Sequence, residues 1–155
     1  MRMARLGIVT LLLLAACQEQ PAPRLPAPAD IAAASAVMDT MASAILRHDG
    51  TKMLSVYWVG DSVTATAHGR VSVGTGALAG RYLPWDTAST WRVQFAWQDR
   101  RLEPLARDVI LATARFTWRS LDSTGAARDS IRGAWSGVFI RNGGRWALRH
   151  EHESW

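Results

Sequence analysis

The chain has 155 residues, enough for one domain of ordinary size, and its 18 Lys and Arg residues against 13 Asp and Glu residues give a formal net charge of +5. The basic residues are spread through alternating apolar segments, and because nucleic-acid binding needs a basic cluster, we expect no nucleic-acid partner. A single cysteine excludes an intramolecular disulfide, so the hydrophobic core has to hold the fold.

The N-terminal segment has the organisation of a secretory signal peptide. Arg2 and Arg5 precede an apolar stretch at residues 6–14, which is too short to cross a bilayer, since crossing needs about 20 residues. This stretch runs into Leu14-Ala15-Ala16-Cys17, which resembles the bacterial lipobox, where the chain is cleaved before a cysteine that carries a diacylglyceryl group. We therefore expect residues 1–16 to be a lipoprotein signal peptide and Cys17 to be lipidated, with palmitate or a similar acyl chain as membrane anchor.

A proline-rich spacer follows the cysteine. Residues 17–29 contain four prolines and no periodic apolar face, so they cannot bury enough surface to fold. We expect them to hold the folded domain, residues 30–155, clear of the membrane of the cell envelope. Gln18 in place of an aspartate after the cysteine favours the outer membrane, facing the periplasm, if the source is a Gram-negative cell.

The first half of the domain has helical periodicity. Asp30 is a candidate N-cap, and Asp49-Gly50 ends the helix because glycine readily adopts the left-handed turn. Shorter helices are expected at about 52–57 and at 74–82, with a short strand at 62–67 between them. The apolar residues of the first helix recur at steps of three and four and share one face: Ile31, Ala34, Met38, Met41 and Ile45.

The second half has the period-two alternation of β-strands. Polar or small residues separate apolar ones at 91–98, and further strands are expected at 109–119, 131–141 and 145–155. Asn142-Gly143-Gly144 is a tight-turn signal that pairs the last two strands as a hairpin. Helices followed by strands predict an α+β fold with an antiparallel sheet over the helices.

Three motifs resemble the SnoaL-like, ketosteroid-isomerase-like superfamily, to which nuclear-transport-factor-like (NTF2-like) proteins also belong. They are Asp49-Gly50 followed by Tyr57, the glycine entry into a helix at residues 74–78, and an ending at residues 143–154 that is similar to the family's Gly-Trp-apolar-x-His-x-His-x-Ser pattern. The resemblance covers about residues 30–155. It implies a cone-shaped fold, in which a strongly curved antiparallel sheet wraps the N-terminal helix, with two further short helices and an apolar pocket. It also implies a homodimer formed through the open sheet.

The isomerase chemistry of that superfamily does not carry over. The carboxylate base of the isomerases would fall at about Ala65 to Ala67 and their tyrosine oxyanion donor near Met41, and none of these residues is ionisable. Proton abstraction beside a carbonyl needs both groups within hydrogen-bond reach. We therefore expect ligand binding more than catalysis, and no cofactor.

The last strand carries the strongest functional signal in the sequence. Strand alternation places His150 and His152 on the same face as Trp146 and Leu148, which is expected to look into the cone. Imidazoles titrate near neutral pH, so the two histidines are candidates for ligand binding or proton transfer. Asp108 shares the inward parity of its own strand and is the candidate acid–base partner.

Two other interpretations of the histidines stay open. They are structural groups at the rim of the pocket, or they bind a metal ion that His68 or Asp61 would complete from across the pocket. The pair by itself is too common a pattern to support a metal, and none is predicted.

Aromatic residues complete the predicted pocket, which suits a small apolar or aromatic ligand. The expected function is thus that of a membrane-anchored lipoprotein whose SnoaL-like pocket binds such a ligand without catalysis. The alternatives are an isomerase or hydratase that uses His150 or His152 with Asp108, or a dimeric structural or interaction module. The predicted pocket residues are Tyr57, Trp58, Trp97, Trp118, Trp135, His150 and His152.

Overall fold

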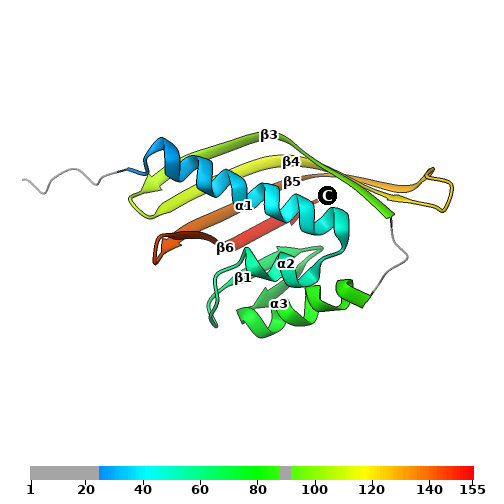
Figure 1. The fold of residues 1–155 in the computed structure, drawn as a ribbon, viewed down its shortest axis with the longest axis horizontal. Coiled ribbons are helices and arrows are strands. Elements are labelled where there is room, and N and C mark those ends of the chain that lie inside the picture. Colours follow the sequence, from blue (N-terminus) through cyan, green and yellow to red (C-terminus); the bar gives the residue numbers. More distant parts are fainter. Residues whose placement is uncertain (1–24, 88–91) are drawn as a thin grey trace, which may run out of the picture.

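Helices come first along the chain and long strands afterwards, which confirms the α+β class. The computed structural model describes residues 25–87 and 92–155, so the predicted signal peptide, Cys17 and most of the spacer lie outside the described residues. The elements are α1 (Pro28–Arg47), α2 (Gly50–Ser55), β1 (Thr64–Ala67), β2 (Arg70–Val73), α3 (Gly74–Tyr82), the 3-10 helix η1 (Leu83–Thr87), β3 (Arg92–Ala106), β4 (Val109–Leu121), β5 (Ala127–Asn142) and β6 (Arg145–Ser154) (Figure 1).

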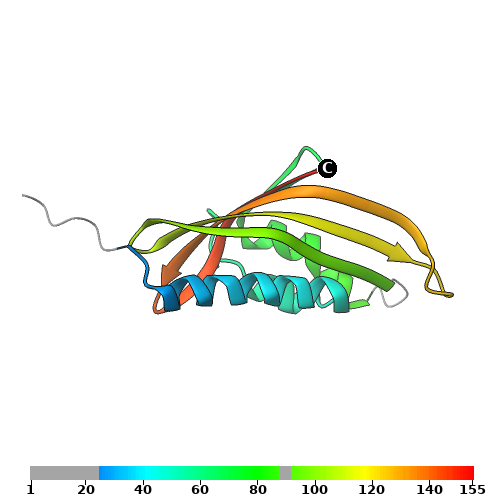
Figure 2. The same cartoon turned by 90° about the horizontal axis from the view of Figure 1, so that it is seen from above.

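The six strands form one curved sheet in the order β2-β1-β6-β5-β4-β3. All neighbouring strands are antiparallel except β1 and β6, which are parallel, so the sheet is mixed. Figure 2 shows α1 running along the hollow side of the arched sheet. The predicted arrangement, a strongly curved sheet around the N-terminal helix with two further short helices, is confirmed.

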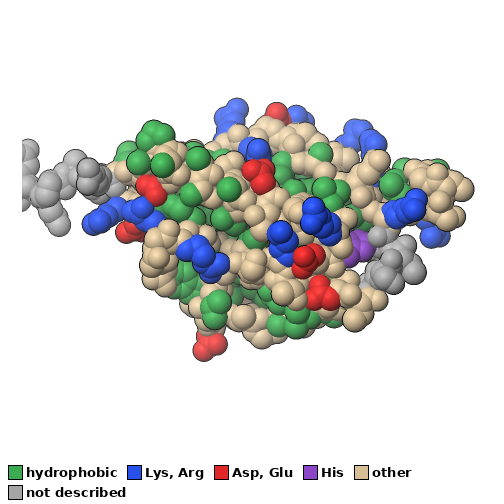
Figure 3. Space-filling model, viewed as in Figure 1, with side chains coloured by type: hydrophobic (Ala, Val, Ile, Leu, Met, Phe, Trp, Pro, Cys, Tyr) green, Lys and Arg blue, Asp and Glu red, His purple; other side chains and the backbone are tan. Residues whose placement is uncertain are grey.

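Helix α1 packs its apolar face against the sheet. By length and composition this 20-residue helix would be able to cross a membrane, yet its buried residues contact the core: Ala34, Met38, Met41 and Ala44. The indole Nε1 of Trp97 on β3 donates a hydrogen bond of 3.1 Å to the Met38 carbonyl, which ties the helix to the sheet. Viewed from the side of α1, basic side chains are interspersed with acidic ones (Figure 3).

Both ends of α1 differ from the sequence prediction. The helix begins at Pro28, whose missing N–H is not needed in the first turn, and Asp30 lies inside the helix and accepts a 3.0 Å hydrogen bond from the Ala27 N–H. At the other end His48, and not Gly50, takes the left-handed conformation, with φ of 53°. Gly50 starts α2, where any side chain would collide with the Tyr82 carbonyl oxygen. The predicted N-cap role of Asp30 and helix-ending role of Gly50 are therefore wrong.

Strand β2 does not follow from the sequence pattern. A tight turn at His68 and Gly69, both with positive φ, joins β1 to β2, so the predicted strand at 62–67 is the first half of a hairpin. Val71 and Val73 of β2 are exposed, so this strand lacks the buried alternation by which strands are recognised. Strand β3 also runs beyond 98, through a register irregularity between Gln98 and Arg101 that interrupts its alternation.

A β-bulge in β6 changes which face its C-terminal half presents. Leu148 pairs with Phe139 of β5, but the next pair is His150 with Val138, so Arg149 is an extra residue without a partner. An extra residue reverses the alternation of everything that follows it. As a result Glu151 is completely buried, at 0% exposure, on the side of the core. The predicted inward direction of His150 and His152 is wrong: His150 is half-buried and His152 is exposed.

Candidate functional site

A cavity of about 230 Å³ lies between the helices and the hollow side of the sheet. The C-terminal end of α1, the short helices α2, α3 and η1, and strands β3 to β6 all contribute to its wall, so it forms only when the sheet curves over the helices. Most of its wall is apolar or aromatic. The lining residues are Ile45, Met53, Arg81, Tyr82, Trp85, Phe95, Phe116, Trp118, Ile131, Glu153 and Trp155.

One end of the cavity is polar. The carboxyl of Glu153 on β6 and the guanidinium of Arg81 on α3 are 3.9 Å apart, and their side chains are 21% and 29% exposed. The Arg81 guanidinium also lies 5.1 Å from the centre of the Tyr82 ring. Burial raises the pKa of Glu153 to about 8; the charge of Glu151 acts in the same direction and Arg81 opposes it. This carboxyl therefore carries a proton for much of the time near neutral pH.

Glu151 lies behind Glu153 at the centre of a buried hydrogen-bond network. Its Oε1 accepts hydrogen bonds from the hydroxyls of Tyr57 and, at 3.0 Å, Tyr82; its Oε2 accepts one of 2.9 Å from Trp135 Nε1. The two tyrosine hydroxyls are also 2.9 Å from each other. Burial, and then the Glu151 charge, raise the pKa values of both tyrosines well above their usual range, so both stay neutral. Because both oxygens of Glu151 already accept hydrogen bonds, this carboxyl is not available as a base for a ligand in the cavity.

Local sequence explains how Trp135 and Tyr57 reach Glu151. Gly137 is the register partner of Glu151, and a side chain there would overlap the Trp135 ring, so the glycine lets the indole lie across its own strand. Tyr57 follows α2 and forms a parallel bridge with Leu148 of β6. Backbone hydrogen bonds of 2.8 Å on either side of the bridge hold this segment beside β6.

The structure separates the five predicted aromatic pocket residues into three groups. Trp118 lies in the cavity wall, and Tyr57 and Trp135 contact Glu151 behind it. Trp58 and Trp97 pack against the core but do not line the cavity.

Neither predicted histidine lines the cavity. The Nδ1 of His150 is 2.7 Å from the Thr64 hydroxyl on the neighbouring strand β1, so its ring is engaged at the sheet and not in the cone. His152 lines a shallow hollow on the outer side of the sheet.

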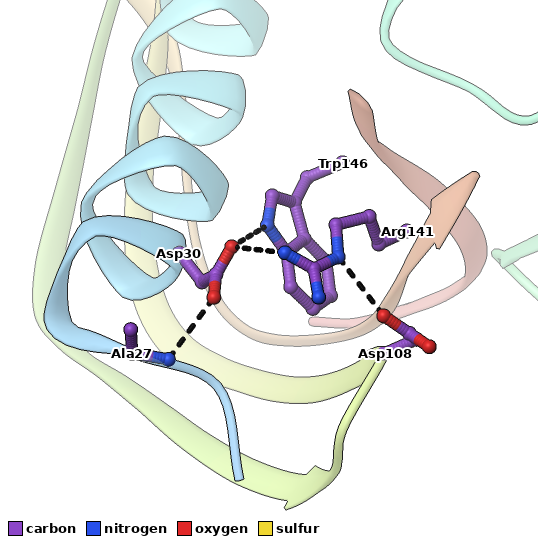
Figure 4. A network of polar contacts seen from close by, with 5 residues as sticks. All are labelled: Ala27, Asp30, Asp108, Arg141 and Trp146. Atoms are coloured by element: carbon purple, nitrogen blue, oxygen red, sulfur yellow. Dashed lines mark hydrogen bonds and ion pairs between the residues drawn. The ribbon is translucent and has the colours of Figure 1, made fainter. Parts of the chain in front are cut away.

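Asp108 lies elsewhere, in a network at the start of α1 (Figure 4). Its carboxylate accepts a 2.9 Å hydrogen bond from Arg141 Nε, and Arg141 also forms a 2.7 Å ion pair with Asp30. Asp30 additionally accepts a 3.2 Å hydrogen bond from Trp146 Nε1. The predicted pairing of Asp108 with His150 or His152 is wrong, because Asp108 is exposed and bound to Arg141 at the turn before β4.

The described residues offer no cluster of metal ligands. Among residues 25–87 and 92–155, no three His, Cys, Asp or Glu side chains come together in a way that would hold a metal ion. His68 packs edge-on against Trp155, with ring centres 3.8 Å apart, and Asp61 is exposed.

The polar residues of the site were missed at the level of sequence. Strict alternation from Trp146 and Leu148 would place Glu151 and Glu153 on the outer face, because the bulge at Arg149 has no local signature, and nothing local distinguishes Arg81 and Tyr82 on their short helix. One signal was available: Glu151 and Glu153 alternate with the two histidines, so reversing the face of this strand exchanges one pair for the other.

Residues 34–155 match the SnoaL-like domain family. The fold is similar to that of a candidate dehydratase of the NTF2-like family from Streptomyces avermitilis, with 21% identity and a TM-score of 0.68 over 81% of this chain and 95% of that chain. It is also similar to an NTF2-like protein of unknown function from Pseudomonas putida KT2440, with 17% identity and a TM-score of 0.69 over 83% of this chain and 87% of that chain. A third similar structure is the association domain of CaMKII from C. elegans, with 19% identity and a TM-score of 0.65 over 78% of this chain and 92% of that chain. No match was found among curated proteins. At these identities, the structural likeness shows the fold alone.

Proposed function

This chain belongs to the SnoaL-like domain family, and we propose that its cavity binds a small, flat apolar or aromatic molecule. The observation that carries the proposal is the wall of the cavity, in which six aromatic side chains surround a space with a single polar end. Ligand sites are typically apolar concavities with a few well-placed polar groups. The volume of about 230 Å³ is below the roughly 300–1,000 Å³ of sites for drug-sized ligands, which favours a molecule of one or two rings.

We further propose that Cys17 anchors the domain to a membrane of the cell envelope. The support is the lipobox-like segment at residues 14–17. Ile45, in the cavity wall, is about 25 Å along the helix axis from Pro28, where α1 begins. An anchor ahead of α1 would therefore attach at the end of the domain that is remote from the cavity.

The anchor is tested by replacing the cysteine. Cys17→Ser should abolish labelling by an alkyne analogue of palmitate and move the protein from the membrane fraction to the soluble fraction. Labelling that persists in Cys17→Ser would contradict the anchor without affecting the cavity.

A homodimer through the outer side of the sheet is the proposed assembly. The hollow on that side is lined by groups of both signs, including Asp99, Arg115 and His152, and Arg115 forms an ion pair with Asp99. A twofold axis brings identical patches together, so a patch of mixed charge can complement itself. Sedimentation equilibrium tests the dimer, and Arg115→Glu should shift the equilibrium towards monomer.

Thermal unfolding with and without 1-naphthol tests the binding proposal. A ligand that binds only the folded state raises the melting temperature. Ile131 on β5 lines the cavity beside Trp118, its register partner on β4. Ile131→Trp should therefore fill the space and abolish the shift in melting temperature. Val138→Trp, on the same strand but facing the other side, should keep it. Equal shifts in the wild type and both variants would show that 1-naphthol binds elsewhere.

A further inference from the structure

The polar end of the cavity is one positive charge short. Two carboxyls, Glu151 and Glu153, face a single guanidinium, that of Arg81. The groups that donate hydrogen bonds to Glu151 are neutral: the hydroxyls of Tyr57 and Tyr82 and the indole of Trp135. Burial acts to lower the pKa of Arg81, but Tyr82, Glu151 and Glu153 together raise it, as expected in a negative field. Glu153 reduces the excess of negative charge at this end by holding a proton.

The remaining titratable groups around the cavity do not supply the missing charge at this end. His48 and His68 contact the rings of Trp85 and Trp155, respectively, and neither histidine is among the lining residues. Asp86 on η1 is occupied with α2, where it accepts a 2.5 Å hydrogen bond from the Gly50 N–H. Within residues 25–87 and 92–155, Arg81 is thus the one cation in the cavity wall.

The rest of the cavity wall is suited to a positively charged organic molecule. Six aromatic side chains line the space, and the faces of aromatic rings attract organic cations through their quadrupoles, most strongly where water is excluded. A carboxylate at the end of an aromatic-lined cavity adds a charge-assisted contact. The aromatic side chains are Trp85, Phe95, Phe116, Trp118 and Trp155, with Tyr82 beside the polar end.

We propose that the ligand is a small organic cation, an aryl or alkyl ammonium, whose charge lies beside Glu153 and whose apolar body lies among the aromatic side chains. This inference rests on the proposed binding function and specifies the class of ligand. The cation replaces the proton of Glu153: as it binds, the carboxyl ionises and releases the proton to solvent, so the net charge of the site is conserved. An anionic ligand would instead face the carboxylate of Glu153, with Glu151 buried behind it.

Proton release makes the affinity depend on pH. Below the pKa of Glu153, a cation has to displace a proton, so its affinity should fall by about tenfold for each pH unit. Above that pKa, the affinity should level off. A neutral ligand of similar size displaces no proton and should bind equally well at both ends of the range.

Calorimetric titration of the full chain with three probes tests this. The probes share a benzyl group and differ in charge: benzyltrimethylammonium, benzyl alcohol and phenylacetate. We expect benzyltrimethylammonium to bind most tightly at about pH 9 and much more weakly at about pH 6, on either side of the pKa of Glu153. Benzyl alcohol should bind with an affinity that does not change with pH.

Glu153→Gln separates the charge of the carboxyl from its shape. It should weaken benzyltrimethylammonium binding at about pH 9 by about tenfold to a hundredfold and remove the pH dependence, so that the cation no longer binds more tightly than benzyl alcohol does. Glu103→Gln, the same change at an exposed position of β3, is the matched control and should alter nothing. If Glu153→Gln does not fold, the pH dependence of the wild type decides the question on its own.

The outcomes are distinguishable. Cation binding that is no tighter than benzyl alcohol binding, or that is independent of pH, overturns the cation proposal and leaves the cavity as a neutral aromatic site. Absence of binding by every probe, 1-naphthol included, overturns the binding function itself and the cation proposal with it.

Discussion

Trp135 is the register partner of Glu153, yet its indole Nε1 donates its 2.9 Å hydrogen bond to Glu151, two residues earlier on the same strand. The indole reaches this partner by lying across Gly137, the residue opposite Glu151. Glu153 therefore does not bind the indole; it forms an ion pair with Arg81, 3.9 Å away, and lines the cavity. Two carboxyls on one strand face consequently play different parts: one is held by three donors, and the other is available to a ligand.

Loss of the Glu151 carboxylate should destabilise the fold strongly. Glu151→Ala leaves the two tyrosine hydroxyls and the Trp135 indole without their acceptor in a fully buried place, which should cost about 3–5 kcal/mol in the free energy of unfolding. Urea denaturation measures this cost. His152→Ala, on the same strand but exposed, should change the free energy by less than about 0.5 kcal/mol. If His152→Ala cost more stability than Glu151→Ala, the strand would present its histidines to the core.

Stability should fall as the pH rises towards 8. Glu153 has an ordinary pKa near 4.5 when unfolded and a pKa of about 8 when folded, so the folded state holds the proton more tightly. Its stabilising contribution is complete below the unfolded pKa and is lost progressively up to the folded pKa. In urea denaturation at several pH values, Glu153→Gln should remove this decline and be the more stable protein at the alkaline end. Parallel pH profiles for the wild type and the variant would contradict it.

Deletion of Arg149 should be far more damaging than its substitution. The bulge places Glu151 and Glu153 on the core side, and without the extra residue they would turn outwards and the histidines inwards. We expect the deletion to abolish cooperative thermal unfolding, and Arg149→Ser to stay within about 0.5 kcal/mol of the wild type. A deletion variant that unfolds cooperatively with an unchanged midpoint would show that the bulge is dispensable.

Asp30 should stabilise the fold through both the helix and the sheet. Hydrogen bonds from the Ala27 N–H and then Trp146 lower its pKa, as does the Arg141 charge, so its contribution is present above the unfolded pKa and lost as the pH falls through the lower folded one. Asp30→Ala should lower the melting temperature at neutral pH by more than Asp108→Ala, because Asp108 is exposed, whereas Asp30 is less exposed and binds both Arg141 and Trp146. The difference between Asp30→Ala and the wild type should shrink in acid; a difference that is independent of pH would contradict this role.

Local chemistry was sufficient to predict much of the fold. The apolar steps of α1, the glycine entry into α3 and the Asn142-Gly143-Gly144 turn are decided by neighbours along the chain, and all three are found in the structure. The family followed from motifs of the same local kind, and residues 34–155 match it. The lipobox-like segment at 14–17 is likewise a local pattern, and the anchoring of Cys17 stays a prediction.

Only the tertiary structure decided which face of β6 looks into the cavity. The bulge at Arg149 arises because β6 has to pair with β5 on one side and β1 on the other, and neither constraint is written in residues 145–155. Tyr57 meets Glu151 across 94 positions of sequence, after the chain has bridged to Leu148. Alternation along a strand has a period of two, so a single unpaired residue exchanges the inside for the outside. Residues 145–155 by themselves give the last strand two histidines and two glutamates; the pairing of three strands turns the glutamates to the core side, where Glu151 is buried and Glu153 lines the cavity.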